Sequence, residues 1–558
     1  MPPPPATVSK FIFACFSICI GFIGFAQKSK KSAIERPKLV IGIVVDQMRA
    51  DYVYRFAEYY GEGGFKRFLK QGFDCRNTNY NYVPTYTAPG HAAIYTGSVP
   101  AFNGIISNDW YDRSWGKVRY CVNDPDVQSV GTEAASGKMS PASLLSTTVT
   151  DELRLSNNKQ SKVIGVCIKD RGSVLPAGHM PTGAYWFDNV TGNFVTSSFY
   201  AKELPQWVKD FNAKKLPDFY LSKPWETVYP IARYKLGLSD GDEYRKNFKG
   251  ETTGKFPHDL PKIRELLGYE LLRKIPMGNT FTLDFALEAI EKENLGKGKY
   301  TDFLALSFSS TDYVGHQFGI NAIEVQDTYV RLDKDLERLF AYIDKNIGMD
   351  NVLLFLTADH GAAQTPDYLT ANGVPAGFLP EDEFKKQLND FMIESFGKGD
   401  WIENYNSQQI YLNYKTINDK KADVAAIVQK LRQYVKKLPG IQEVWDIHDP
   451  ETVVTSGNEH HSRIANGVHP KRSGDIAIML QPGWLEGEYD AHKGTTHGSG
   501  WSYDTHVPLL WLGWKIKQGA SSAAVDITDI APTVSDLLSI SFPNATVGKP
   551  ISDMILKR

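Results

Sequence analysis

Six acidic and imidazole side chains stand where they could hold metal ions: Asp46, Asp312, His316, Asp359, His360 and His497. Carboxylates and imidazoles are ligands that zinc and similar dications prefer. Asp312 and His316 are four residues apart, so one helical turn aims both inward, whereas Asp359 and His360 are adjacent and point apart. Adjacent ligands that diverge can serve two neighbouring metals, which is the arrangement that many phosphate-ester hydrolases use.

Each of these residues taken alone has a plainer interpretation. A single Asp after a strand is more often a helix cap, and a single His is more often a satisfied structural group. The shared placement at strand ends and in short loops is what favours a metal site. Histidines without such placement are interpreted as structural or left uncertain: His91, His179, His460, His461, His492 and His506. Among them, His492 is the one most easily confused with His497.

A threonine opens the segment Thr87-Ala88-Pro89-Gly90-His91. Proline followed by a compact apolar run predicts a helix start, with Thr87 at or near the N-cap. A hydroxyl there meets free backbone N–H groups and the positive end of the helix dipole, which favours a phosphoryl oxygen. An ordinary N-cap is the alternative interpretation, and Thr85 is the rival hydroxyl.

Buried strands must deliver these groups. Apolar runs end shortly before Asp46, Lys169, Asp312 and Asp359, and a further run follows near the C-terminus: 39–45, 163–167, 303–308, 352–356 and 507–512. Such runs are typical of parallel strands that present catalytic groups at their C-terminal ends. Amphipathic patterns over 281–293 and 321–347 supply the crossover helices. The sequence therefore predicts an α/β fold with a mostly parallel central sheet flanked by helices.

Two stretches break this rhythm and predict inserted caps, residues 172–276 and 363–494. The second contains a strand over 409–413, a helical run over 419–437 and a strand over 444–447, which indicates a small β-α-β subdomain. The core then consists of residues 38–171, 277–362 and 495–558.

Composition restricts the function further. The chain has 558 residues, of which 42% are hydrophobic, and a net charge of −2, so no global field favours nucleic acid or an anionic membrane. Residues 1–26 contain one charge, Lys10, before an apolar run, which predicts a secretory signal peptide cut before Gln27. We expect a periplasmic or secreted protein without stable membrane association, with a monomer favoured although the oligomeric state is open.

Cysteines are sparse. Cys15 and Cys19 would leave with the signal peptide, so Cys75, Cys121 and Cys167 remain. An odd count permits at most one intramolecular disulfide and argues against a disulfide scaffold or a thiolate zinc site.

Five motifs together resemble the alkaline phosphatase superfamily, in order and over nearly the whole mature chain: Val45-Asp46-Gln47-Met48-Arg49, the Thr87 segment, Thr311-Asp312-Tyr313-Val314-Gly315-His316, Thr357-Ala358-Asp359-His360-Gly361 and Gly494-Thr495-Thr496-His497-Gly498. The resemblance implies two Zn²⁺ per chain. One would be held by Asp312, His316 and His497, the other by Asp46, Asp359 and His360, with the nucleophile Thr87 between them.

Lys169 and Arg171 separate monoesterases from diesterases. Two apart on an extended segment, they would point to the same side and meet the dianionic phosphoryl group of a monoester. The segment around them, Ile168 to Gly172, resembles the phosphate-irrepressible, periplasmic type of alkaline phosphatase. Asn108 would donate its amide to a phosphoryl oxygen, as the resemblance implies. A solvated pair bound to Asp170 is the plainer interpretation of the two cations.

The sequence thus predicts an enzyme that hydrolyses small phosphate monoesters through a phosphothreonine intermediate and releases phosphate. A phosphodiesterase or nucleotide pyrophosphatase on the same fold is the first alternative. A zinc-containing phosphate-binding protein without turnover is the second.

Overall fold

The protein is described by a computed structural model over residues 1–2, 35–449, 459–487 and 493–556. Residues 36–558 form one unit, which the following description concerns. The predicted signal peptide, apart from its first two residues, and His492 lie outside the described ranges, so those predictions stay predictions. Within these ranges no helix has both the length and the apolar character that crossing a membrane requires.

An 11-stranded sheet forms the framework, in the order β17-β2-β18-β10-β1-β9-β6-β7-β8-β5 with β19 paired to β2. Its strands are β1 (Leu39–Val45), β2 (Phe73–Asn79), β5 (Ser129–Val130), β6 (Val163–Cys167), β7 (Gly183–Asp188), β8 (Asn193–Ser197), β9 (Asp302–Phe308), β10 (Val352–Thr357), β17 (His506–Val507), β18 (Leu509–Gly513) and β19 (Gly519–Asp526). The five strands β10, β1, β9, β6 and β7 run parallel. The predicted α/β class with a mostly parallel sheet is confirmed.

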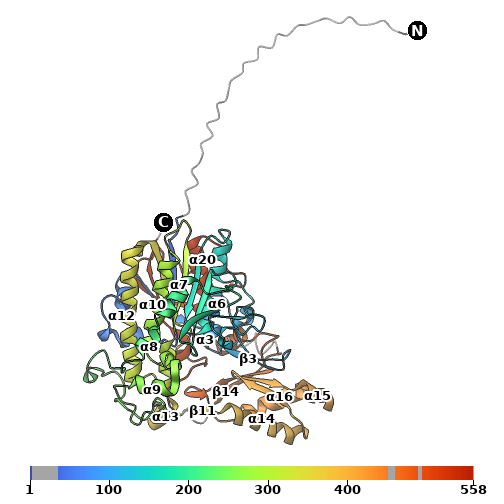
Figure 1. Cartoon of the computed structure of the whole chain (residues 1–558). Coiled ribbons are helices and arrows are strands. Elements are labelled where there is room, and N and C mark those ends of the chain that lie inside the picture. The colour runs from blue at the N-terminus through green and yellow to red at the C-terminus, as the bar shows by residue number, and fades with distance from the viewer. Residues whose placement is uncertain (3–34, 450–458, 488–492, 557–558) are drawn as a thin grey trace. The chain divides into compact units, whose positions relative to one another are not determined.

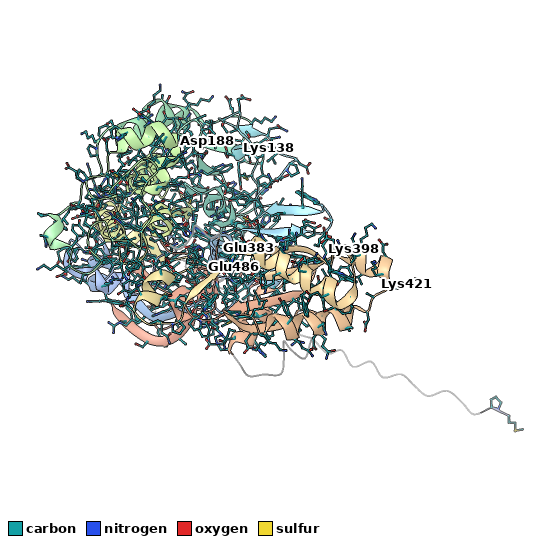
Figure 2. All side chains as sticks on the ribbon, turned by 90° about the horizontal axis from the view of Figure 1, so that it is seen from below. Lys138, Asp188, Glu383, Lys398, Lys421 and Glu486 are labelled. Atoms are coloured by element: carbon teal, nitrogen blue, oxygen red, sulfur yellow. The ribbon has the colours of Figure 1, made fainter. Side chains whose placement is uncertain are left out.

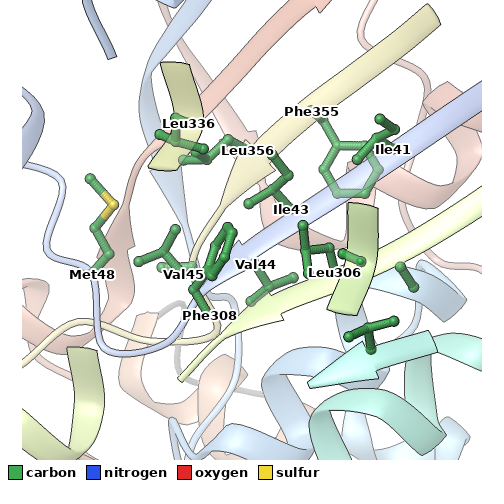
Figure 3. Packing of buried hydrophobic residues seen from close by; sticks show 14 of the residues in the cluster. Ile41, Ile43, Val44, Val45, Met48, Leu306, Phe308, Leu336, Phe355 and Leu356 are labelled. Atoms are coloured by element: carbon green, nitrogen blue, oxygen red, sulfur yellow. The ribbon is translucent and has the colours of Figure 1, made fainter. Parts of the chain in front are cut away.

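The central strands are apolar on both faces because helices cover both sides of a parallel sheet. Every residue of β1, β9 and β10 is buried. Figure 3 shows Ile41, Ile43 and Val45 of β1 in one cluster with residues of the neighbouring strands and Leu336 of helix α12. This continuous core holds the C-terminal ends of the parallel strands at one edge.

Helices connect the strands and cover the sheet. Those nearest the functional residues are α3 (Thr87–Thr96), α6 (Asp170–Ala177), α10 (Met277–Lys292), α11 (Ser310–Phe318), α12 (Ile323–Asn346) and α20 (Ile530–Leu538). Figure 1 shows α10 beside α12, and the two pack against each other. The predicted run 507–512 is interrupted at Pro508, which has no N–H to donate, so it forms β17 and the antiparallel β18.

The first predicted cap, residues 172–276, is smaller than expected. Most of α6 falls in its first residues, and β7 and β8 extend the main sheet next to β6. All residues of β7 are buried, so it is a core strand. Its aromatic residues suit a buried strand, whereas the sequence pattern predicted that they belong to a cap. The remainder contains α7 (Gln206–Ala213), α8 (Leu216–Tyr220), α9 (Leu260–Leu267) and a 3₁₀ segment, η4 (Gly268–Lys274).

The second predicted cap, residues 363–494, contains a separate four-stranded antiparallel sheet in the order β12-β13-β15-β14. Its elements are α14 (Glu381–Phe396), β12 (Ile402–Asn406), β13 (Gln409–Leu412), α15 (Tyr414–Lys420), α16 (Val424–Val435), β14 (Ile441–Asp446), α18 (Glu459–Gly467) and β15 (Ile476–Leu480). The predicted helical run splits at Lys421, whose φ is 51°. This subdomain has its own hydrophobic core, and Figure 2 labels Glu383, Lys398 and Lys421 on its surface.

Candidate active site

Four strand ends bring the predicted residues to one edge of the sheet. Asp46 directly follows β1, Asp359 follows β10, Asp312 lies in α11 after β9, and Lys169 follows β6. Because β10, β1, β9 and β6 are consecutive and parallel, their C-terminal ends lie side by side. This is the edge where ligands bind in open α/β sheets.

One compact group consists of Asp46, Asp359 and His360, whose ligand atoms all lie within 4.8 Å of one another. All three side chains are fully buried. Asp46 Oδ1 and Asp359 Oδ2 are buried and have no hydrogen-bond partner among the described residues. Burial and the neighbouring charge of Asp46 hold the pKa of Asp359 well above its usual range. Two carboxylates forced together in this way indicate a place for a cation.

A second compact group consists of Asp312, His360 and His497, with ligand atoms again within 4.8 Å. His316 contacts the same carboxylate, with Nε2 3.0 Å from Asp312 Oδ1. The rings of His360 and His497 are stacked with centroids 3.4 Å apart, whereas the rings of His316 and His497 are 5.3 Å apart. The predicted set of Asp312, His316 and His497 therefore meets at Asp312, but His360 takes the place of His316 in the compact group.

The three histidines share one hydrogen-bond pattern. Nδ1 of His316, His360 and His497 lies 2.8, 3.0 and 2.7 Å from the backbone carbonyls of Thr495, Gly361 and Thr85. A carbonyl oxygen only accepts, so Nδ1 carries a proton in all three rings, and in the neutral rings of His360 and His497 Nε2 presents a lone pair toward the carboxylates. Histidines that bind metals are commonly fixed in this tautomer by such bonds.

The pKa values of the histidines differ. Burial lowers the pKa of His360 to about 3. Burial, together with the charges of His360 and His316, holds the pKa of His497 well below its usual range. For His316, burial acts in the same direction, but the Asp312 carboxylate outweighs it and raises the pKa. His360 and His497 are therefore neutral at pH 7, the form that binds metals.

Lys169 is the cation that this structure places among the carboxylates. Its Nζ lies 2.6 Å from Asp312 Oδ2 and 2.8 Å from Asp46 Oδ2. Burial would lower the pKa of Lys169, but the two carboxylates raise it above its ordinary value. Burial likewise opposes the charged form of Asp312, yet His316 and Lys169 keep its pKa well below the usual range. Asp46 and Asp312 thus share one ammonium, and Asp359 lies beside Asp46 with its charge disfavoured, an arrangement that divalent cations fit.

Arg171 lies on a helix, so the predicted extended geometry of the Lys169–Arg171 pair is wrong. β6 ends at Cys167 and Lys169 is the N-cap of α6, which places Arg171 in its first turn. Arg171 Nη1 donates to Tyr120 Oη over 2.9 Å, and Tyr120 Oη donates to Asp170 Oδ1. Within the described ranges the Arg171 side chain is held by Tyr120 and forms no ion pair with Asp46 or Asp312, the carboxylates that Lys169 contacts.

Thr87 and Asn108 meet at the N-terminus of α3. Thr87 is the first helical residue, with Tyr86 as N-cap, and its Oγ1 lies 3.5 Å from His360 Nε2. The Ala88 N–H donates to Asn108 Oδ1 over 2.9 Å. With its oxygen held in this way, Asn108 has its NH₂ group left to donate. The rival Thr85 uses its hydroxyl on the Ser499 carbonyl, 2.9 Å away.

Two neighbours of the site were not singled out from the sequence. His91, one helical turn after Thr87, is buried between the Thr87 carbonyl and Ser307 Oγ, each 2.9 Å away. Gln47 hydrogen-bonds both Asp312 and Asp359. The i, i+4 spacing from Thr87 is a signal for His91, whereas Gln47 sits inside a quoted motif with no chemical signal of its own.

Other histidines have partners outside these groups, and Cys167 accepts a hydrogen bond from the Lys169 N–H over 3.2 Å. His179 binds Asp151 Oδ2 and the Leu144 carbonyl, and His506 binds the Arg76 carbonyl. His460 and His461 belong to α18. Cys75, Cys121 and Cys167 are buried free thiols, so the described residues contain no disulfide.

Comparisons with known proteins agree with the site. The family described as type I phosphodiesterase / nucleotide pyrophosphatase matches residues 40–504. Alkaline phosphatase PhoV of Synechococcus elongatus is 46% identical over 98% of this chain and 100% of its own. Alkaline phosphatase PafA of Elizabethkingia meningoseptica is 47% identical over 95% of this chain and 97% of its own. A protein of Myroides odoratus named calcium-transporting ATPase is 47% identical over 96% of this chain and 97% of its own.

A solved structure supports the same relationship. The crystal structure of wild-type alkaline phosphatase PafA has a TM-score of 0.91 at 47% identity, covering 94% of this chain and 100% of that one. The matched sheet, the near full-length relatives and the family match lead to one conclusion. The chain belongs to the type I phosphodiesterase / nucleotide pyrophosphatase family of the alkaline phosphatase superfamily, and its fold is that of the PafA alkaline phosphatase.

Proposed function

We propose that the protein is a zinc-dependent alkaline phosphatase that hydrolyses phosphate monoesters through a phosphothreonine at Thr87 and releases inorganic phosphate. One observation carries the proposal: three buried carboxylates and two histidines form two adjoining groups of ligand atoms, and the Thr87 hydroxyl lies 3.5 Å from His360, which belongs to both groups. Alkaline phosphatases at 46–47% identity over nearly the whole chain support the enzyme class.

Two zinc ions would account for the donor set. Asp46, Asp359 and His360 would hold one, and Asp312, His316 and His497 the other, with the Thr87 oxygen completing a coordination sphere. The unpartnered oxygens of Asp46 and Asp359 and the fixed histidine tautomers support this assignment. When bound, zinc lowers the pKa of a hydroxyl and stabilises the departing oxygen of an ester.

The residues of the chain then carry out two displacements. Thr87 Oγ1 gives its proton to solvent and attacks phosphorus, the bond to the ester oxygen breaks, and the alcohol leaves with a proton from solvent. Water then gives a proton to solvent and attacks the phosphothreonine from the side that the alcohol has left, the P–O bond to Thr87 breaks, Thr87 regains a proton, and phosphate departs. Thr87 lies at the N-terminus of α3, whose dipole favours negative charge on the phosphoryl oxygens.

Three side chains would stabilise charge on the non-bridging oxygens. The oriented Asn108 amide is a neutral donor, and Lys169 and Arg171 are cations suited to a dianion. Lys169 binds Asp46 and Asp312 in this structure, so it becomes available to substrate when other cations balance those carboxylates. A second PafA structure has a threonine, an asparagine, a lysine and an arginine replaced, the same four residue types in the same order.

A phosphodiesterase is the alternative that the family description itself keeps open. The names of the near full-length relatives and the position of Lys169 among the carboxylates favour monoesters. A zinc-containing phosphate-binding protein without turnover would need the same ligands but no exchange of phosphate through Thr87. We further propose small-molecule substrates and export to the periplasm or the medium, on the sequence of residues 1–26.

A pair of substrates tests the proposal. The zinc-loaded protein is assayed with an aryl phosphate and with the methyl diester of the same phosphate. We expect faster turnover of the monoester by several powers of ten, loss of activity after chelation, and recovery with Zn²⁺. Faster diester turnover would establish the phosphodiesterase instead. Binding of phosphate without any turnover would establish the binding protein.

A further inference from the structure

Gln47 connects the carboxylates of both candidate metal groups. It directly follows Asp46 and is 3% exposed. Its backbone N–H donates to Asp359 Oδ1 over 3.1 Å, and its side-chain Nε2 donates to Asp312 Oδ1 over 2.8 Å. We propose that Gln47 is a positioning residue that sets the separation of the two metal groups by holding Asp312 and Asp359 at fixed distances from one backbone position.

The backbone of Gln47 supports a specific role. Its φ is 62°, in the left-handed region that favours glycine and that side chains with a Cβ rarely adopt. Such conformations persist where surrounding structure enforces them, and they are enriched at functional sites. The left-handed turn comes two residues after the end of β1 and directs the N–H of Gln47 toward the end of β10. A glycine would adopt this turn more readily, so the side chain at this position is retained against a conformational cost.

Gly315 provides the space for the Gln47 amide. A Cβ added at Gly315 would lie 1.8 Å from Gln47 Oε1, far inside contact distance. Gly315 belongs to α11, the helix that also carries Asp312 and His316. The glutamine after β1 and the glycine of α11 therefore form an interlocking pair. This packing fixes where the amide N–H points, independently of the hydrogen bond itself.

The consequence for metal binding rests on the proposed function. Residues that hydrogen-bond metal ligands typically change metal affinity or activity by about 10–100-fold when they are replaced. The side-chain amide of Gln47 contacts Asp312, so its loss should weaken metal binding by the Asp312 group, whereas the backbone N–H bond to Asp359 survives substitution. A residue that served only the fold would affect activity in proportion to stability.

Two variants separate these roles, Gln47→Ala and Gln47→Gly. Both variants remove the side-chain amide and keep the backbone N–H, but only glycine relieves the strain of the left-handed backbone. The readouts are Zn²⁺ affinity of the metal-free protein by competition with a chromogenic chelator, the unfolding midpoint, and kcat and KM for an aryl phosphate. We expect both variants to bind Zn²⁺ about 10–100-fold more weakly, with Gln47→Gly unfolding at a higher temperature than Gln47→Ala. Recovery of Zn²⁺ affinity in Gln47→Gly would overturn the proposal. Metal binding would then depend on relief of the left-handed backbone and not on the side-chain amide.

A double-mutant cycle with Gly315→Ala tests the packing without any metal. Gly315→Ala should lower the unfolding midpoint strongly when Gln47 is present and much less in the Gln47→Gly background. Equal losses in both backgrounds would show that the amide is not seated against Gly315. Gln326→Met, which replaces a buried glutamine of α12, is the matched control and should leave Zn²⁺ affinity unchanged. If wild-type protein binds no Zn²⁺, the proposed function fails while the cycle still reports on Gln47.

Discussion

Replacing Lys169 with alanine should affect the metal-free protein far more than the zinc-loaded protein. In the structure its ammonium lies 2.6 Å from Asp312 and 2.8 Å from Asp46, and all three side chains are buried. Removing one partner of a buried ion pair costs about 3–5 kcal/mol, because the remaining charge is left without compensation. We expect a loss of that size in the free energy of unfolding after chelation.

With zinc bound, the carboxylates have other cations and the stability loss should shrink. Activity should still fall, because a hydrogen bond to a charged group contributes about 1.5–3 kcal/mol, which corresponds to roughly 10–150-fold in kcat/KM for a monoester. Unfolding in urea, followed by tryptophan fluorescence with chelator or with excess Zn²⁺, measures the first effect. Aryl phosphate kinetics measure the second.

Lys386→Ala is the matched control. Lys386 forms an exposed ion pair with Asp390 on α14, so its loss should leave the free energy of unfolding nearly unchanged in either condition. Equal destabilisation of metal-free and zinc-loaded protein by Lys169→Ala would refute the reasoning. The ammonium would then support the fold and would not stand in for a metal charge.

Three further predictions concern the same site. Thr87→Ala should abolish the phosphate label seen by intact-mass analysis after acid quench, and equal labelling of the variant would move the nucleophile to Thr85. Asp359→Asn should reduce bound zinc from about two ions to about one by elemental analysis, and unchanged zinc content would exclude Asp359 as a ligand. The metal-free variant should unfold at a higher urea concentration than wild type, because burial and Asp46 disfavour the Asp359 charge. Lys169→Ala combined with Arg171→Ala should narrow the monoester-to-diester ratio of kcat/KM by several powers of ten, and equal slowing of both substrates would contradict a role in charge recognition.

The strands of the site could be predicted because their hydrophobic runs are continuous and end at chemically distinctive residues. β1 and β6 match the predicted 39–45 and 163–167, and β9 and β10 each extend the prediction by one residue. The predicted first cap begins inside the main sheet because β7 is a buried strand without a simple alternating pattern. Its pairing with β6 therefore could not be predicted from the local sequence. Pairing between distant strands is a tertiary property that periodicity does not encode.

Within the site, residue types were more predictable than directions. The candidate ligands lie close together, whereas Arg171 turns toward Tyr120 because α6 begins immediately after Lys169. His360 belongs to both compact groups, whereas the resemblance assigns it to one metal. Gln47 was overlooked since its role depends on a left-handed backbone and on the space at Gly315, neither of which residue type reveals.

The subdomain with its own core has a consequence for how the site can open. β3 (Asp109–Asp112) and β4 (Lys117–Tyr120) form a hairpin that starts directly after Asn108 and ends at Tyr120, the partner of Arg171. Polar contacts join this hairpin to the subdomain: Tyr111 with Glu403, Arg113 with Asp475 and Asp109 with Asn406.

Regions with separate cores can unfold locally while the rest of the protein stays native. Fluctuations of the subdomain would therefore reach Asn108 and Arg171, the two proposed phosphate contacts next to the hairpin, and leave the loops after β1 and β10 in place. Hydrogen exchange of the backbone amides in β12 and β13 would then report how firmly the proposed contacts to the substrate's phosphate are held in place.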